Sequence, residues 1–317
     1  MQKFAGFCDN LLFNIIFSIQ IPLFMMIAGY ARNYSKPIDS IQQFVIHIKK
    51  RAVSILLPWA SWSLIGCFLL WKMPLADYII KAAFQMEIAF WFLFSLFTID
   101  VIFSSGELVS KKTGKRVPQS VIHIIVSMCG VTVLFFIGKY AVGLSFLGIK
   151  YSCYYIVFFF AGYFLFRVFH SREKYTNEIF RWAPLACFGI YGYLITRYSV
   201  FTLPDSSWYV GLRIGISLLG CMIAFFIMWQ VKITRESKSK LIKVLERIGS
   251  LSLEIYVVHY FAVRLLECES YNINTIDGMF YCFVYMFFVL GITCGTIWVL
   301  SQFAITRLIL FGKKRRV

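Results

Sequence analysis

The stretch IQQFVIHIKKRAVSILLPWASW, residues 41–62, joins a cationic segment directly to an apolar one. It starts polar, reaches His47, Lys49, Lys50 and Arg51, and then continues into an apolar run without a break. If the stretch is helical, one stripe holds Gln43, His47, Lys50 and Ser54 at steps of four, three and four, with Arg51 beside them. Such a stripe at the edge of a hydrophobic span predicts a place where a water-soluble anion meets the bilayer surface. The alternative is that these cations only fix the orientation of the span, as Lys and Arg do at cytoplasmic span ends.

The composition of the chain is that of a membrane protein. Its 317 residues are 60% hydrophobic, 19% aromatic and 15% charged. Several apolar runs approach the roughly 20 residues that cross a bilayer as a helix. These runs are continuous rather than alternating, which argues against a membrane β-barrel. We therefore predict an all-α polytopic membrane protein that forms one domain over residues 1–317.

Neither the charge nor the cysteines indicate another class of protein. The net charge of +17 is spread between the apolar runs rather than over one soluble module, so a nucleic-acid partner is not predicted. The nine cysteines are scattered and form no CxxC pair. Neither a disulfide framework nor a metal site is predicted from them.

The apolar runs predict about nine transmembrane helices. Their ranges are 11–31, 52–72, 88–105, 119–138, 149–169, 179–197, 209–231, 248–267 and 278–303. Of the 32 Lys and Arg residues, 24 lie in one set of connections, which includes the C-terminal tail. Because cytoplasmic connections carry an excess of Lys and Arg, the C-terminus is predicted to be cytoplasmic and the N-terminus outside. One cationic connection, 232–247, also holds apolar residues and is predicted to form an amphipathic helix on the inner leaflet.

His259 is the candidate for chemistry inside the membrane. It lies ten residues after Gly249, which places it about 15 Å into a hydrocarbon core of about 30 Å. Gly249, Ser252, Tyr256 and His259 follow one another at steps of three, four and three, so they share one helical face. An ionisable residue at this depth points to function. The alternative is a structural histidine that is hydrogen-bonded to a neighbouring helix.

Other polar or small residues in the spans carry structural expectations. Glu254 and Asp100 are expected to pair with cations near the cytoplasmic surface. His47 and His123 are close enough to that surface to be expected in contact with solvent. Gly29 is expected to allow the close approach of another helix.

Five blocks of sequence follow one another in a familiar order. They are IPLFMMIAGY (21–30), KKRAVSILLPW (49–59), FWFLFSLF (90–97), FFFAGYFL (158–165) and IGSLSLEIYVVHYF (248–261). In order and spacing they resemble the membrane-bound acyltransferase 3 family, whose members move acyl groups onto sugars of cell-surface polysaccharides and glycolipids. The resemblance extends from residue 20 to about residue 265.

The resemblance implies a specific reaction and location. It implies about ten helices, with acyl-CoA as a cytoplasmic co-substrate and no bound cofactor. The acceptor would be a cell-envelope glycan or lipid-linked sugar, reached from the outer side or within the membrane. Acetyl is the expected acyl group. The expected location is the bacterial cytoplasmic (inner) membrane, as a multi-pass protein.

Three departures from the family pattern stand out. The family's first helix, which carries an Arg and a later His usually held catalytic, has no counterpart in this sequence. Its absence agrees with the predicted external N-terminus, which one more span upstream would return to the cytoplasm. We therefore expect that an original first helix is missing. In the basic motif Ser54 stands where the family has a second arginine, and Ala28 replaces the usual serine before Gly29 and Tyr30.

Acyl transfer from a thioester to a sugar hydroxyl needs an anchor for the coenzyme phosphates, a base and charge stabilisation at the carbonyl oxygen. Lys49, Lys50 and Arg51 are predicted to bind acyl-CoA, because Arg binds phosphate in a bidentate manner and Lys as a point charge. His259 is predicted to be the base. The supporting residues are Ser252 and Tyr256, which would orient His259, together with Tyr30 and Trp91.

The sequence leaves open a protein without catalytic activity. Such a protein would be a truncated, inactive acyltransferase or a transporter of lipid-linked sugars. A transporter would place charged or polar pairs along a continuous path through the membrane, and the sequence has few ionisable groups at mid-depth. The DNA upstream of Met1 would test the truncated alternative, by the presence of an in-frame helix with an Arg and a later His.

Overall fold

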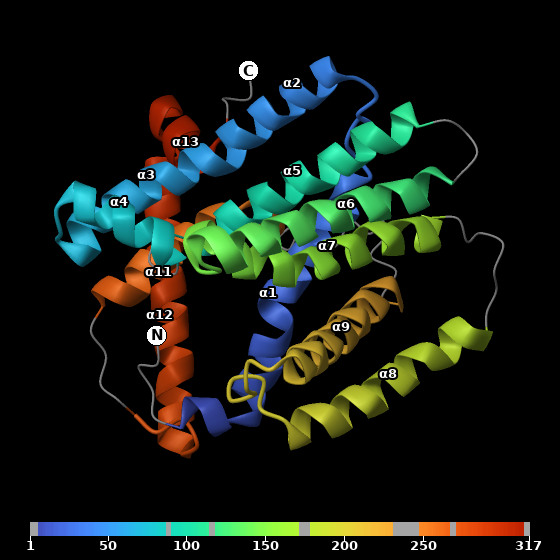
Figure 1. Ribbon diagram of the computed structural model, residues 1–317. Coiled ribbons are helices and arrows are strands. Elements are labelled where there is room, and N and C mark those ends of the chain that lie inside the picture. The colour runs from blue at the N-terminus through green and yellow to red at the C-terminus, as the bar shows by residue number, and fades with distance from the viewer. Residues whose placement is uncertain are drawn as a thin grey trace. The chain divides into compact units, whose positions relative to one another are not determined.

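The computed structural model describes residues 6–86, 90–113, 118–170, 178–230, 247–266 and 271–313. Its described elements are helices throughout (Figure 1), which confirms the predicted all-α class of polytopic membrane protein. The amphipathic helix predicted for 232–247 lies outside the described residues, except for Arg247 at its end.

Seven helices in the described part of the chain are long and apolar enough to cross a membrane. They are Leu11–Arg32, Ile41–Trp71, Trp91–Lys112, Gln119–Val142, Phe146–Leu165, Ser207–Met228 and Ile276–Leu300. The other two predicted spans correspond to helices α8 (Glu178–Arg197) and α11 (Ser252–Leu265), the second of which has only 14 residues. The count of nine and the orientation stay predictions.

The chain divides into two compact units. Unit 1 comprises residues 1–34, 158–251 and 267–288, and unit 2 comprises 35–157, 252–266 and 289–317. Helices α7 (Ile149–His170) and α12 (Ile276–Leu300) contribute residues to both. The prediction of a single domain over 1–317 is not tested by this division and stays a prediction.

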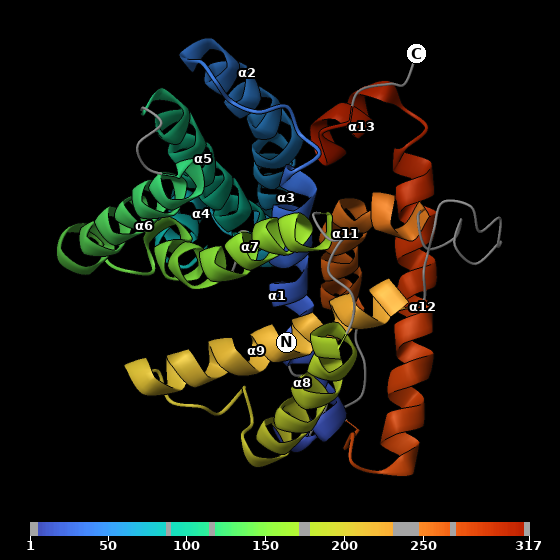
Figure 2. The ribbon, with the colours of Figure 1, turned by 90° about the vertical axis from the view of Figure 1, so that its right-hand side faces the viewer.

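Unit 1 is built around helix α1 (Leu11–Arg32), which packs against α8 and α9 (Ser207–Gln230), as Figure 2 shows. A short 3-10 helix, η1 (Phe7–Asp9), precedes α1. The side chain of Asn10 caps the first turn of α1 by accepting hydrogen bonds from two backbone N–H groups, as N-cap residues do. These contacts leave the C-terminal half of α1 to meet α7.

Gly29 confirms the expected close helix approach. A Cβ atom at Gly29 would lie 1.9 Å from the carbonyl oxygen of Phe159, and one at Gly162 would lie 1.8 Å from that of Met26. At each glycine, a carbonyl group of the other helix therefore occupies the space that a side chain would fill. Small residues at such crossings are the usual means of bringing membrane helices together.

Unit 2 is organised on one unbroken helical run from Ile41 to Trp71 (Figure 1). Its parts are α2 (Ile41–Arg51), the π-helical η2 (Ala52–Leu56), α3 (Leu57–Gly66) and the π-helical η3 (Cys67–Trp71). Pro58 accounts for the change of winding at η2. It has no N–H to donate to the carbonyl of Ser54 and its ring crowds that carbonyl, and a wider π turn relieves this conflict.

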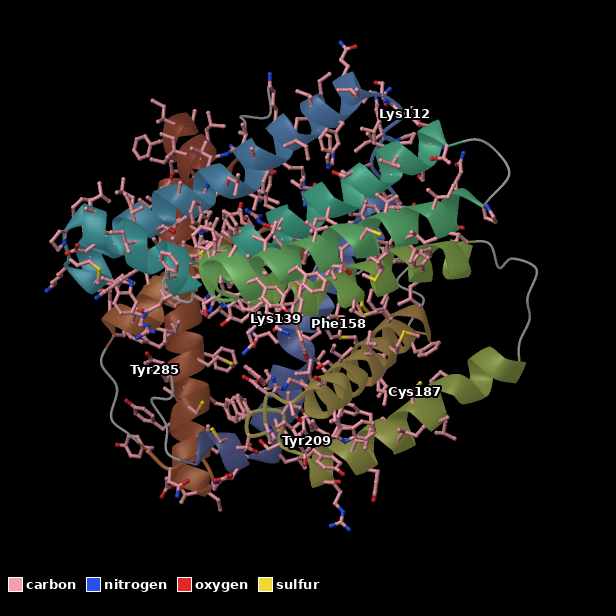
Figure 3. The ribbon with its side chains drawn as sticks, in the orientation of Figure 1. Lys112, Lys139, Phe158, Cys187, Tyr209 and Tyr285 are labelled. Atoms are coloured by element: carbon pink, nitrogen blue, oxygen red, sulfur yellow. The ribbon has the colours of Figure 1, made fainter. Side chains whose placement is uncertain are left out.

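Helices α5 (Trp91–Lys112) and α6 (Gln119–Ile137) form a hairpin in unit 2. Figure 3 labels Lys112 at the end of α5 and Lys139 just beyond α6, which mark the two ends of this hairpin. The expectation that His123 contacts solvent is wrong, because the hairpin buries its side chain. His123 is 4% exposed, and its Nε2 atom donates to the carbonyl oxygen of Phe103 at 2.9 Å.

Shorter helices complete unit 2. They are α4 (Leu75–Phe84), the π-helical η5 (Gly138–Val142), the 3-10 helix η6 (Phe146–Gly148), α11 and α13 (Ala304–Phe311). The C-terminal α13 lies against α3, where the indole Nε1 of Trp62 donates to the carbonyl oxygen of Leu310 at 2.7 Å. Gly312 then ends α13 in the left-handed region, with φ +64°.

Candidate active site

Three side chains of unit 2 form an ionic group that we name the Arg51 cluster: His47, Arg51 and Asp100. Asp100 Oδ2 lies 2.8 Å from His47 Nε2 and 3.2 Å from Arg51 Nε. The Asp100 side chain is only 2% exposed. The expectation that Asp100 pairs with a cation is confirmed. The expectation that His47 contacts solvent holds in part, because its side chain remains 16% exposed where α5 packs against α2.

Local helix geometry explains why these groups meet. His47 and Arg51 are four residues apart on α2, so they stack on one face of the helix. Asp100 reaches that face from α5, which packs against α2 and η2. The hydroxyl of Ser54 donates to the carbonyl oxygen of Arg51 at 3.2 Å. Ser54 stands in place of the second arginine of the basic motif, and its hydroxyl is thus hydrogen-bonded to the backbone of Arg51.

The three predicted phosphate-binding cations differ in exposure. Lys49 and Lys50 are exposed, whereas the Arg51 side chain is 31% exposed and held by Asp100. Arg51 uses Nε in this pair, and a guanidinium carries four further N–H donors on its terminal nitrogens. An oriented Arg51 next to two exposed lysines is a chemically suitable anchor for a phosphate group.

His259 lies on α11 with a defined tautomer. Its Nδ1 atom is 2.7 Å from the carbonyl oxygen of Ile255, which can only accept a hydrogen bond, so Nδ1 carries the proton. In the neutral imidazole this leaves the lone pair on Nε2, the atom that can accept a proton. The ring of Tyr256 lies 6.1 Å from that of His259. Ser252 begins α11 two turns earlier on the same face.

Glu254 pairs with Lys313, which joins α11 to the residue that follows α13 and Gly312. The pairing of Glu254 with a cation was expected from the sequence and is confirmed. Its side chain is 2% exposed, and its Oε2 atom has no hydrogen-bond partner in the part of the chain that the structure describes. A buried carboxylate in this state depends strongly on the cation that pairs with it.

Two supporting residues lie in aromatic groups. Tyr30 belongs to unit 1, where its ring is 5.8 Å from that of Phe225. Trp91 belongs to unit 2, where it stacks on Tyr151 with ring centroids 4.2 Å apart and lies 5.4 Å from Tyr155. Trp91 is therefore part of an aromatic stack, while the roles predicted for Tyr30 and Trp91 stay predictions.

Contacts along α11 fix its direction relative to the 41–71 run. At one end Lys313 pairs with Glu254, while a Cβ atom at the neighbouring Gly312 would lie 2.6 Å from Ser54 Cα. Glu254 is thus tied through two adjacent residues to the segment next to Arg51. This end of α11 belongs to the Arg51 end of unit 2.

Further along, α11 meets the other end of the same run. The ring of Phe261 lies 5.0 Å from that of Trp62, and the Arg264 guanidinium lies 5.6 Å from the ring of Trp71. Arg51 and Trp71 are twenty residues apart, about 30 Å at the rise of an α-helix, which is the thickness of a bilayer core. His259 lies at an intermediate level between them.

Within the described residues, the seven apolar helices of span length indicate an integral membrane protein. An acyltransferase domain family model matches residues 2–301. The chain belongs to the acyltransferase 3 family, which confirms the resemblance of its motifs, and it is in general terms a membrane acyltransferase. Neither the curated proteins nor the solved structures gave a match.

The pairing of His47 with Asp100 was missed from the sequence. The available signal was Asp100 itself, a carboxylate five residues from the inner end of a predicted span, where a buried charge needs a cation as its partner. The sequence offered many cations near that level and gave no reason to prefer His47 or Arg51 over the lysines. The choice is made by the contact of α5 with α2.

Proposed function

We propose that the protein transfers an acyl group, by family resemblance acetyl, from acyl-CoA to a hydroxyl of a cell-envelope glycan or lipid-linked sugar. Acyl-CoA would be a co-substrate rather than a bound cofactor, and the enzyme would act in the bacterial cytoplasmic membrane. Membership of the acyltransferase 3 family supports acyl transfer as the reaction class. The donor and the acceptor are those that the family resemblance implies, and the chemistry of the site supports an anionic donor.

The Arg51 cluster supports an anionic donor. Arg51 is oriented by a buried carboxylate, and Lys49 and Lys50 are exposed beside it. Coenzyme A carries several phosphate groups, which an arginine binds through two parallel hydrogen bonds. We assign the phosphates to Arg51, with the two lysines adding attraction from solvent.

The observation that carries the proposal is the course of α11 beside the 41–71 run. Contacts of α11 with the Arg51 level and with the Trp71 level lie on either side of His259, and Nε2 is the unprotonated nitrogen of its neutral ring, which supports His259 as the base. A thioester arm that starts at Arg51 and a hydroxyl that comes from the Trp71 level would meet near this depth. This arrangement suits transfer across part of the membrane thickness.

The chemical step is a simple acyl exchange. Nε2 of His259 takes the proton of the acceptor hydroxyl as its oxygen attacks the thioester carbonyl carbon. A C–O bond forms and the C–S bond breaks through a tetrahedral intermediate. The proton then passes from the imidazolium to the departing thiolate, so that coenzyme A leaves as its thiol and the ester remains on the acceptor.

The donor half of the proposal is tested by binding of coenzyme A to the purified full chain in lipid nanodiscs. We expect Arg51→Gln to weaken binding by about tenfold or more, as loss of a charged hydrogen-bonded pair does. Lys81→Gln, at an exposed cation on α4, serves as the matched control and should leave binding unchanged. Equal affinity of the parent and Arg51→Gln would remove Arg51 as the anchor.

The catalytic half is tested by transfer of radiolabelled acetyl from acetyl-CoA to cell-envelope glycan in membranes. We expect His259→Gln to lower transfer by about 100-fold or more, the usual scale for loss of a general base. Coenzyme A binding should be retained. If transfer by the parent protein depends on the chain but survives His259→Gln, His259 has only a structural role.

A further inference from the structure

A cation lies close to two aromatic rings at the Trp71 end of unit 2. The guanidinium carbon of Arg264 is 5.6 Å from the centroid of the Trp71 ring and 5.5 Å from that of the Tyr260 ring. Such cation–π contacts attract a guanidinium only modestly at an exposed site. Arg264 is exposed, so a ligand from solvent can reach its guanidinium.

Both aromatic residues carry a buried polar atom that lacks a partner. Within the residues that the structure describes, neither Nε1 of Trp71 nor the hydroxyl of Tyr260 makes a hydrogen bond. A buried donor without an acceptor costs free energy, and native structures rarely leave one without a reason. Two such donors flank the same guanidinium, which suggests that a ligand supplies the missing acceptors.

The chemistry of these groups defines the ligand they fit. Trp Nε1 and a guanidinium can only donate hydrogen bonds, and a tyrosine hydroxyl can donate one as well. The complement is a molecule with many acceptor oxygens and at least one negative charge. Lys72, which follows Trp71 directly and is exposed, adds a second cation at this level.

We propose that Trp71, Tyr260 and Arg264 form a binding subsite for an anionic sugar, the acceptor of the reaction. Its carboxylate or phosphate binds the Arg264 guanidinium and draws it away from the two rings. The sugar hydroxyls then accept hydrogen bonds from Trp71 Nε1 and the Tyr260 hydroxyl. The aromatic faces that the guanidinium leaves become available to the sugar ring.

The location of the subsite agrees with this role, which rests on the proposed function. Tyr260 is the next residue after His259 on α11, and Arg264 follows one turn later. A sugar held at Arg264 would therefore lie near the candidate base. The subsite is about 30 Å along the 41–71 helix from Arg51, so the donor phosphates and the acceptor charge have separate sites.

The test measures binding of three probes to the full chain in nanodiscs by saturation-transfer NMR titration. The probes are glucose 1-phosphate, glucuronic acid and neutral glucose. We expect one or both charged sugars to bind more tightly than glucose, and the preferred one identifies phosphate or carboxylate as the recognised group. Arg264→Gln should weaken charged-sugar binding by about tenfold or more. Trp71→Phe and Tyr260→Phe, which keep the rings, should each weaken it by roughly three- to tenfold.

Controls separate the subsite from general effects. Lys139→Gln removes a cation that lies 5.2 Å from the centroid of the Tyr140 ring elsewhere in unit 2, and it should leave sugar binding unchanged. Arg264→Lys retains the charge and should recover part of the affinity, which also covers the case in which Arg264→Gln fails to fold.

Variants that bind charged sugars within twofold of the parent would overturn the proposal. So would absence of charged-sugar binding while coenzyme A still binds. If coenzyme A does not bind but charged sugars do, the proposed function is contradicted and the sugar subsite is still supported.

Discussion

His47 donates from Nε2 to Oδ2 of Asp100 across 2.8 Å and thereby joins α2 to α5. The same oxygen accepts from Nε of Arg51. One buried carboxylate thus fixes two side chains that are one helical turn apart. Because a buried charge is stable only when it is paired and hydrogen-bonded, the position of Arg51 is coupled to the packing of these two helices.

Replacement of Asp100 by Asn tests this coupling. The amide lacks the charge that holds Arg51 and His47, so we expect a loss of roughly 1–3 kcal/mol in the free energy of unfolding. Coenzyme A affinity should fall as well, because Arg51 loses its orientation. Thermal unfolding and coenzyme A binding in nanodiscs measure the two effects. Asp77→Asn, at an exposed carboxylate on α4, should change neither, and an unchanged Asp100→Asn protein would contradict the coupling.

A comparison of Arg51→Lys with Lys50→Arg separates geometry from charge. Both variants keep the net charge of the motif. Lysine at position 51 loses the planar bidentate fork, so we expect coenzyme A affinity to fall by about fivefold to tenfold, in line with the loss of one hydrogen bond. Lys50 is exposed, and its replacement by Arg should have little effect. Similar affinities for the two variants would show that only charge matters at this site.

The ion pair between Lys313 and Glu254 is predicted to hold α13 and its terminal residues against the rest of unit 2. Lys313→Ala leaves the Glu254 carboxylate buried without the cation that pairs with it, and we expect it to destabilise the protein by roughly 1–3 kcal/mol. Lys313→Arg should retain most of the stability. The sharper check is a double-mutant cycle by thermal unfolding. The double variant Lys313→Ala with Glu254→Gln should be more stable than Lys313→Ala alone, and strictly additive effects would disprove a direct interaction.

The helix crossing in unit 1 is predicted to be intolerant of a single methyl group. Gly29→Ala places a Cβ atom where the Phe159 carbonyl oxygen now lies, and overpacking of this kind costs roughly 1–3 kcal/mol or more. The matched control is Gly215→Ala in α9, where a Cβ atom meets nothing within 4 Å. It should be neutral or stabilise the helix by about 0.5–1 kcal/mol. Thermal unfolding of both variants in detergent measures the two effects.

The hydrophobic runs and family motifs predicted much of what the structure contains. Apolar runs of span length specify helices because a lipid-exposed backbone must satisfy its own hydrogen bonds. Gly29 and Glu254 were also interpreted correctly, since a small residue in a span and a carboxylate near its end each have few stable environments. The winding of η2 was not predicted, although Pro58 is its visible cause.

Local sequence alone determined that this chain is a helical membrane protein with cations at particular span ends, because composition and periodicity act over a few neighbouring residues. Which cation meets Asp100, that Lys313 is the partner of Glu254, and that Arg264 lies over the ring of Trp71 were decided only by tertiary structure. These contacts join segments that are far apart in the sequence. Their contacts depend on how the helices pack, which no local pattern specifies.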